Sequence, residues 1–161
     1  MDLSQFTSSG RLPAEELARQ RAFFQTHAPA FLSERYCLTP DDPTGLVFDG
    51  HGELINPCHA LACRACGGDR HGVTMHLRGL ATACAGCGHA ETLMGTPGEG
   101  AARTCDCGAV HRRVGVRLEY PGDLFEDGVD PTQAAEFFSW VTVYADCPDC
   151  DMAEPLADAE A

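Results

Sequence analysis

The sequence predicts a small metal-bound α+β fold, in which a helical N-terminal segment precedes two consecutive metal-bound units of short antiparallel strands. Three observations lead to this prediction. Residues 13–27 carry helix signals, eight of the ten cysteines form four close pairs, and the segments between the pairs are short and rich in strand-forming residues. A length of 161 residues suffices for one ordinary domain or two small ones.

The N-terminal segment begins with the helix-like stretch PAEELARQRAFFQTH at residues 13–27. Pro13 suits the first helical position, and Glu15 and Glu16 lie near the positive end of the helix dipole. Pro29 is expected to end or kink this helix before a second short one. We assign residues 1–40 to the helical segment and residues 41–62 to a hairpin or linker.

After residue 62 the chain consists of short strand-like segments with cysteine pairs at their ends. They read GVTMHLRG, ATACAGCGHAETLM, AVHRRVGVRLEY and SWVTVYADC. The stretch GTPGEGAA at 95–102 has the composition of a linker. We therefore expect a first unit at 63–94, a second at 103–152 with an insertion at 118–138, and a disordered acidic tail at 153–161.

The four cysteine pairs have the character of metal ligands. Zinc in structural sites takes four thiolate or imidazole ligands in a tetrahedron, and C-x-x-C supplies two of them from one tight turn. Gly67, Gly88 and Gly108 each follow the second cysteine of a pair, where glycine permits the left-handed conformation that closes such a turn. The sequence predicts two zinc ions per chain, bound by Cys63, Cys66, Cys84, Cys87, Cys105, Cys107, Cys147 and Cys150.

These turns resemble those of the zinc-ribbon families of the rubredoxin-like, double zinc ribbon type. The resemblance rests on CRACGG, CAGCG, CDCG and CPDC, covers roughly residues 63–150 and identifies no particular protein. It implies two consecutive zinc ribbons, in each of which two cysteine turns cap short antiparallel strands around one zinc. The CDC pair is one residue shorter than the family pattern, so the resemblance is weaker for the second ribbon than for the first.

Three pairings of the four cysteine pairs are open: sequential, nested and interleaved. We favour sequential pairing, because each half then contains strands that flank its own cysteine turns, and residues 63–92 form a self-sufficient ribbon. Cys37 and Cys58 are interpreted as buried thiols. His59 with Cys63 and Cys66 has the spacing of other metal motifs, so whether His59, Cys58 or Cys37 joins a site stays open.

The charge distribution bears on the partner. The net charge is −13; residues 118–161 carry twelve acids and no base, whereas residues 63–117 hold seven arginines against four acids. An acidic surface repels nucleic acids and anionic membranes. The N-terminus has no basic or apolar signal region, and no apolar run reaches eighteen residues, so we expect a cytoplasmic protein with no membrane contact.

The function predicted first is that of a non-catalytic zinc-binding adaptor or regulator acting through protein–protein interaction. Four protein ligands leave zinc no open position, and neither a phosphate-binding loop nor a nucleophile elbow occurs, so an enzyme is disfavoured and no small-molecule substrate is evident. The second hypothesis is a nucleic-acid-binding or transcription-associated protein. A redox or iron–sulfur protein is third. The nucleic-acid hypothesis would use Arg103, Arg112, Arg113 and Arg117.

Overall fold

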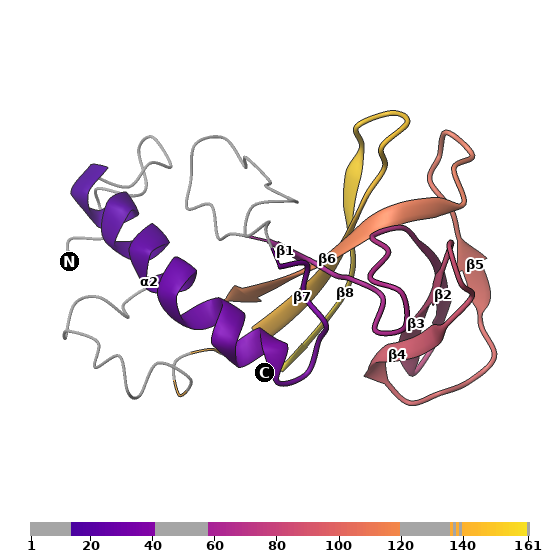
Figure 1. Ribbon diagram of the computed structural model, residues 1–161, viewed down its shortest axis with the longest axis horizontal. Helices are drawn as coiled ribbons and strands as arrows, with labels where there is room; N and C mark the ends of the chain where they lie inside the picture. Colours follow the sequence, from indigo (N-terminus) through magenta and orange to yellow (C-terminus); the bar gives the residue numbers. More distant parts are fainter. Residues whose placement is uncertain (1–13, 41–57, 120–135, 137, 139, 161) are drawn as a thin grey trace.

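A computed structural model of the chain describes residues 14–40, 58–119, 136, 138 and 140–160 (Figure 1). The expected hairpin or linker at 41–62 and the insertion at 118–138 lie largely outside these residues. The described elements are α2 (Ala14–Ser33), β1 (His59–Ala60), β2 (His71–His76), β3 (Gly79–Cys84), β4 (Ala90–Gly95), β5 (Ala101–Arg103), β6 (His111–Glu119), β7 (Trp140–Asp146) and β8 (Ala153–Glu160).

All eight described strands belong to one antiparallel sheet. Its order is β4-β3-β2-β6-β7-β8, with β1 paired to β6 and β5 paired to β2. The sequence of cysteine turn, strand, strand, cysteine turn, strand occurs twice, first with β2, β3 and β4 and then with β6, β7 and β8. In the sheet the two sets meet at β2 and β6, where His71 lies opposite Arg112 and Gly72 opposite His111.

This sheet corrects the predicted fold class. The expected helical segment followed by two separate small ribbons is wrong, because hydrogen bonds between β2 and β6 join the two sets of strands in one sheet. The cysteine spacing determines the local turns, but it carries no information about pairing between strands of different halves. The strand-like segments themselves are confirmed, since β6 and β7 lie within them and β2, β3 and β4 overlap them.

One apolar core spans both halves of the sheet. Val73 and Leu80 from the first half belong to the same buried cluster as the valines and leucines of β6 and β7. Alternating apolar residues on β6 place Val114, Val116 and Leu118 on the buried face, each with no exposed surface. Burial of each such side chain contributes about 1.5–3 kcal/mol to the free energy of unfolding. Because the buried side chains come from both halves of the sheet, the two halves stabilise each other.

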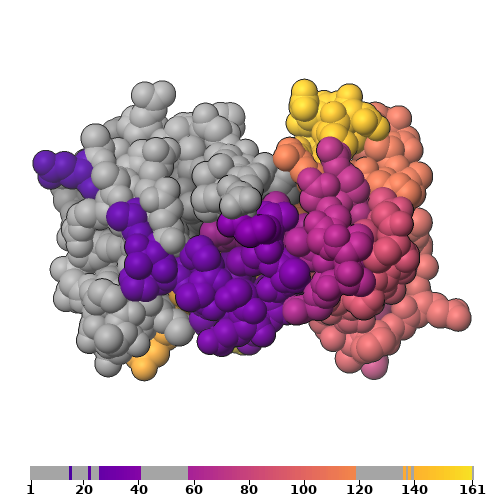
Figure 2. All heavy atoms as spheres, viewed as in Figure 1, coloured from indigo at the N-terminus to yellow at the C-terminus, as the bar shows by residue number. Residues whose placement is uncertain are grey.

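The helix α2 covers this core with its C-terminal part. Ala28 and Leu32 are buried in the cluster, and the rings of Phe31 and Phe138 meet edge to face with centroids 5.1 Å apart. Figure 2 shows residues after 26 of the helix against the segment that follows residue 58. The expectation that the helix ends at Pro29 before a second short helix is wrong, because α2 continues through Pro29 to Ser33. Contact with the sheet compensates for the hydrogen bond that proline removes.

The expected disordered tail at 153–161 is also corrected. Residues Ala153–Glu160 form β8, which pairs with β7 along its length, with a bulge between Val143 and Tyr144. Pro155 is tolerated because β8 lies at the end of the sheet order, where one edge of the strand needs no partner. No helix among the described residues combines the length and apolar character that a membrane crossing needs.

Candidate metal centres

The structure groups the eight cysteines into two tetrads in the sequential order. Cys63, Cys66, Cys84 and Cys87 form the first tetrad, and Cys105, Cys107, Cys147 and Cys150 form the second. Within each tetrad all four sulfur atoms lie within 4.8 Å of one another. Nested and interleaved pairing would bring other pairs together and do not describe this arrangement. Among the described residues, neither tetrad includes Cys37, Cys58 or His59.

The sulfur separations fit a metal ion and are too long for disulfide bonds. The Sγ atoms of Cys63 and Cys87 are 3.6 Å apart, and those of Cys105 and Cys150 are 3.4 Å apart. A disulfide needs about 2.05 Å, and all ten cysteines are free thiols. A tetrahedron with metal–sulfur bonds of about 2.3 Å has edges of about 3.8 Å. Each tetrad could therefore hold a metal ion with little movement of its sulfur atoms.

Backbone hydrogen bonds build every cysteine turn on the same plan. In the first turn, the N–H of Gly67 donates to the carbonyl of Cys63 at 2.8 Å, and the N–H of Cys63 donates to the carbonyl of Gly68 at 2.8 Å. The turns that begin at Cys84 and Cys147 repeat both bonds at the same spacing. The shorter turn of Cys105 and Cys107 closes one residue earlier, through Gly108 and Ala109. The missing residue in CDC therefore leaves the turn intact.

The residue that follows each pair adopts a left-handed conformation. Gly67, Gly88 and Gly108 have φ angles of 77°, 77° and 94°, as their place after the second cysteine predicts. In the fourth turn the position is held by Asp151, with a φ of 59°. Aspartate visits this region more readily than most residues because its short side chain can bond locally. Sequence reasoning could have identified this fourth turn from CPDCD, since Asp151 stands where glycine stands in the other three.

The turns also direct N–H groups at sulfur atoms. The N–H of Ala65 lies 3.4 Å from Sγ of Cys63, and the N–H of Gly86 lies 3.3 Å from Sγ of Cys84. The first cysteine of each pair is buried, with exposed fractions of 0–7%, whereas Cys66, Cys87 and Cys107 are exposed. Each tetrad thus has one side against the core and one side toward solvent.

The thiols of one tetrad do not ionise equally. The pKa of Cys84 falls to about 7, because backbone N–H groups of Cys87 and Gly86 donate to its sulfur. The N–H of Gly68 lowers the pKa of Cys66, but hydrogen bonds with the thiols of Cys84 and Cys87 outweigh it and raise that pKa to about 12. Four neighbouring thiolates repel one another, so a cation that binds all four must displace protons.

The thiols of the second tetrad differ in pKa in the same way. Burial raises the pKa of Cys147, but the N–H groups of Asp149 and Cys150 lower it more, to about 7. For Cys150 the N–H of Met152 lowers the pKa, but hydrogen bonding with Cys105, burial and the other thiols together raise it to about 12. Both tetrads have the donor set and the charge requirement of a divalent-metal site.

The four arginines proposed for nucleic-acid contact lie among acidic or aromatic partners. Arg112 is 1% exposed and donates to Glu154 at 2.8 Å, and Arg103 donates to the same carboxylate at 3.0 Å. Arg113 forms an ion pair with Asp146. The guanidinium of Arg117 lies 4.7 Å from the ring centroid of Tyr144. The nucleic-acid hypothesis has these side chains contact phosphates, whereas Arg112 and Arg113 of β6 form ion pairs with Glu154 of β8 and Asp146 of β7.

The fold and these two tetrads define a cysteine-rich β-sheet protein with two centres that could each hold a metal ion. A scan against protein-family models finds no match, and neither a curated protein nor a solved structure matches the chain. Its function is therefore inferred from the residues themselves.

Proposed function

We propose that each tetrad binds one zinc ion through four thiolates, and that the protein is a non-catalytic adaptor or regulator that acts by binding another protein in the cytoplasm. The observation that carries the metal assignment is the convergence of four sulfur atoms within 4.8 Å in both tetrads. All-sulfur tetrahedral sets favour zinc or iron–sulfur centres over hard cations. Ten free thiols suit a reducing compartment, in which clustered cysteines more often bind metal than form disulfides.

Zinc in these tetrads would be structural. Cysteine ligands would fill all four tetrahedral positions and leave none for water or substrate. The tetrads lie at cysteine turns that begin or end β2, β3, β6, β7 and β8, so each ion would fix the ends of several strands. The zinc would therefore shape a surface rather than supply chemistry.

An acidic protein-binding surface fits the remaining charges. Exposed acids include Asp106 and Asp149 beside the second tetrad and Asp158 and Glu160 on β8. The arginines that the nucleic-acid hypothesis requires lie beside carboxylates or an aromatic ring. Neutralised arginines release few counterions on a phosphate backbone, so they contribute little to nucleic-acid affinity. We therefore rank a protein partner above DNA or RNA.

Elemental analysis of protein purified without added metal tests the metal assignment. We expect two zinc ions per chain, no iron and no visible charge-transfer absorbance. Iron with sulfide would instead establish the iron–sulfur hypothesis. Four disulfides would exclude both the zinc and the iron–sulfur assignment.

A mobility-shift titration tests the choice of partner. Duplex DNA and single-stranded RNA are each titrated at low and at physiological salt. We expect no retardation at physiological salt. Retardation that persists there and disappears in an Arg113→Ala/Arg117→Ala variant would establish the nucleic-acid hypothesis in its place.

A further inference from the structure

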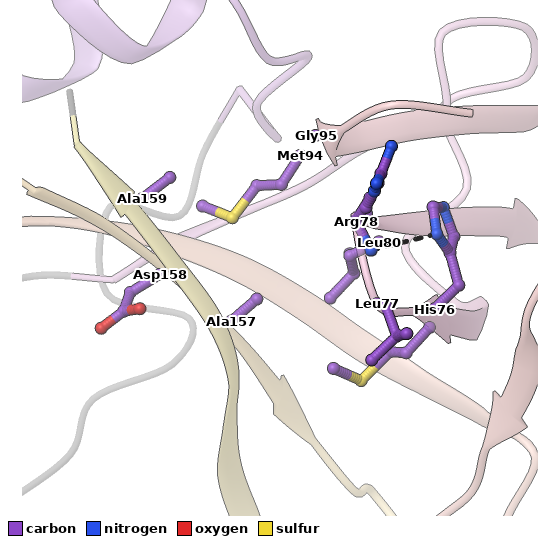
Figure 3. Close-up of a pocket in the computed structure, with 11 residues that line it drawn as sticks. His76, Leu77, Arg78, Leu80, Met94, Gly95, Ala157, Asp158 and Ala159 are labelled. Carbon is purple, nitrogen blue, oxygen red and sulfur yellow. Dashed lines mark hydrogen bonds between the residues drawn. The ribbon is translucent and has the colours of Figure 1, made fainter. Parts of the chain in front are cut away.

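A groove separates the two edge strands of the sheet. Among the described residues, the sheet order begins with β4 and ends with β8, so each of these strands has one neighbour and one edge that no other described strand covers. Two adjoining cavities of about 290 and 350 Å³ lie between them. Met94 and Gly95 of β4 and Ala159 of β8 line both cavities (Figure 3). The groove therefore lies between the C-terminal end of β4 and the C-terminal part of β8.

The backbone edge of β8 faces this groove. Four consecutive residues, Ala157 to Glu160, line it. Successive side chains of a strand point to opposite faces, so one face alone would contribute every second residue. A wall made of consecutive residues presents the edge of the strand. Open edges carry unpaired N–H and C=O groups, which another extended chain can pair with.

The two faces beside this edge differ in chemistry. In Figure 3 the side chains of Ala157 and Ala159 point together toward the side of Met94, and Asp158 points the other way. Ala157 and Ala159 are half-buried, whereas Asp158 and Glu160 are exposed. The opposite wall includes Leu80 of the β2–β3 hairpin, and Arg78 and Arg35 also line the cavities. An added strand would meet the apolar side chains of Ala157, Ala159 and Met94 on one face of β8 and the carboxylates of Asp158 and Glu160 on the other.

The rim of the groove bears an unpaired apolar side chain. Leu77, in the turn between β2 and β3, lines the groove and is fully exposed, at 105%. Solvent exposure of a leucine beside an apolar groove is unfavourable, and a bound chain would cover it.

We propose that the open edge of β8 binds an extended segment of a partner protein in which apolar and basic residues alternate. Its apolar side chains lie beside Ala157, Ala159 and Met94, and its basic side chains lie beside Asp158 and Glu160. This inference deepens the proposed function and rests on it, because it names the surface and the kind of partner.

A second copy of the chain fits this edge poorly. Strand β8 carries Glu154, Asp158 and Glu160 and no basic residue, and the whole chain has a net charge of −13. Pairing two such strands would place like charges across from one another, which destabilises a sheet. Charge complementarity therefore selects a basic partner strand.

Nuclear magnetic resonance on the full zinc-loaded chain tests the proposal. The probe is a short, end-capped peptide in which valine and lysine alternate. The controls are a peptide with the same residues in two blocks and a peptide in which glutamate replaces lysine. We expect the alternating lysine peptide to shift the amide signals of β8 and of Met94 and Gly95. Equal binding of the block peptide, or shifts that lie elsewhere on the chain, would overturn the proposal.

Charge reversal supplies the matched variants. In Asp158→Lys/Glu160→Lys the affinity for the lysine peptide should fall by about tenfold or more, and the glutamate peptide should bind instead. The control Asp69→Lys/Glu99→Lys makes the same change in net charge at exposed positions that do not line the groove, and should retain most of the binding. Equal losses in the two variants would show non-specific attraction and overturn the assignment to β8.

Two further measurements separate the possible failures. Sedimentation without peptide reports self-association, and a dimer whose contact maps to β8 would show that a second copy occupies the edge. Zinc content is measured on every sample. Absent zinc would overturn the proposed function, whereas lost peptide binding with two zinc ions in place overturns only the docking surface.

Discussion

The buried guanidinium of Arg112 and the carboxylate of Glu154 tie β6 to β8 beside the second tetrad. Nη1 of Arg112 donates to Oε1 of Glu154 at 2.8 Å, and Nη2 donates to the carbonyl of Arg103 at 3.0 Å. Arg103 also donates to Glu154, so one carboxylate serves two arginines. Burial raises the pKa of Glu154, but the hydrogen bonds from Arg112 and Arg103 outweigh it and hold that pKa below its usual value.

Removal of Glu154 should cost more stability than removal of Arg112. Glu154→Ala leaves a buried cation without its carboxylate, which costs about 3–5 kcal/mol when both partners are buried. Because the side chain of Glu154 is 31% exposed, we expect the lower end of that range. Arg112→Met replaces the ion by an apolar group of similar length and should cost less. Urea unfolding of the zinc-loaded variants measures both changes.

The exposed pair of Arg64 and Glu91 is the control for this prediction. Its atoms lie 2.7 Å apart, but the side chain of Arg64 is 46% exposed, whereas that of Arg112 is 1% exposed. Glu91→Ala should therefore cost less than about 1 kcal/mol. A loss at Glu91 equal to that at Glu154 would contradict the importance of burial at Arg112.

At the left-handed positions of the cysteine turns, we predict substitutions that change the free energy of unfolding in opposite directions. A Cβ at Gly67 or Gly88 would meet no atom within 4 Å, so alanine there costs only its unfavourable conformation. We expect Gly67→Ala and Gly88→Ala each to lose about 1–2 kcal/mol of unfolding free energy. Asp151→Gly relieves a similar but smaller cost and should be neutral or stabilising by up to about 1 kcal/mol. Thermal unfolding compares the three; a destabilising Asp151→Gly would indicate a side-chain role for Asp151.

The cysteine turns were predictable from sequence because their determinants are local. Two cysteines separated by one or two residues, followed by glycine, specify both the ligands and the turn that presents them. The sequential grouping was predictable for a related reason, since strands lie between the turns of each tetrad. Which metal each tetrad binds stays a proposal.

The shared sheet was not predictable, because its determinants are not local. Nothing in the residues around His71 or Arg112 indicates that β2 and β6 pair. Strand β8 was missed for a different reason. Residues 153–160 do alternate small apolar residues with acids, but alanine is a weak strand former and Pro155 interrupts the pattern. Pairing with β7 outweighs this low intrinsic preference.

Burial of His71 predicts a pH dependence of stability. Its side chain is buried, with Nδ1 lacking a hydrogen-bond partner, and desolvation lowers its pKa although Asp69 and Glu91 act in the opposite direction. Below the ordinary pKa of about 6.5, the unfolded chain therefore binds more protons at this site than the folded chain. Neutral His71 therefore contributes fully to the free energy of unfolding above about pH 6.5, and this contribution declines as the pH falls below about 6.5.

The variant His71→Phe isolates this contribution. Phenylalanine does not titrate, so between about pH 7.5 and pH 5.5 its unfolding free energy should fall less steeply than that of the unchanged protein. Protonation of zinc-bound thiolates weakens both proteins alike and cancels in the comparison. Urea titrations at several pH values measure the two slopes, and parallel slopes would show that His71 is protonated equally in both states.

Loss of the first metal centre should unfold the second half of the sheet as well. Cys84→Ser removes one ligand of the first tetrad, and structural zinc contributes on the order of 10–16 kcal/mol of apparent binding energy. That energy exceeds the net stability of a typical domain. Since Val73 and Leu80 share one core with Val114 and Val143, the loss cannot stay confined to β2, β3 and β4. If residues 63–92 formed a self-sufficient ribbon, loss of its zinc ion would leave the second half of the sheet folded.

Trp140 measures this coupling, because it is the only tryptophan and lies on β7, in the half without Cys84. In Cys84→Ser its fluorescence should report unfolding at a much lower urea concentration than in the unchanged protein. Cys37→Ser is the control, since Cys37 lies outside both tetrads and is half-buried, and its midpoint should move little. An unchanged Trp140 midpoint in Cys84→Ser, with one zinc ion still bound, would mean that the two halves fold independently despite the hydrogen bonds between β2 and β6.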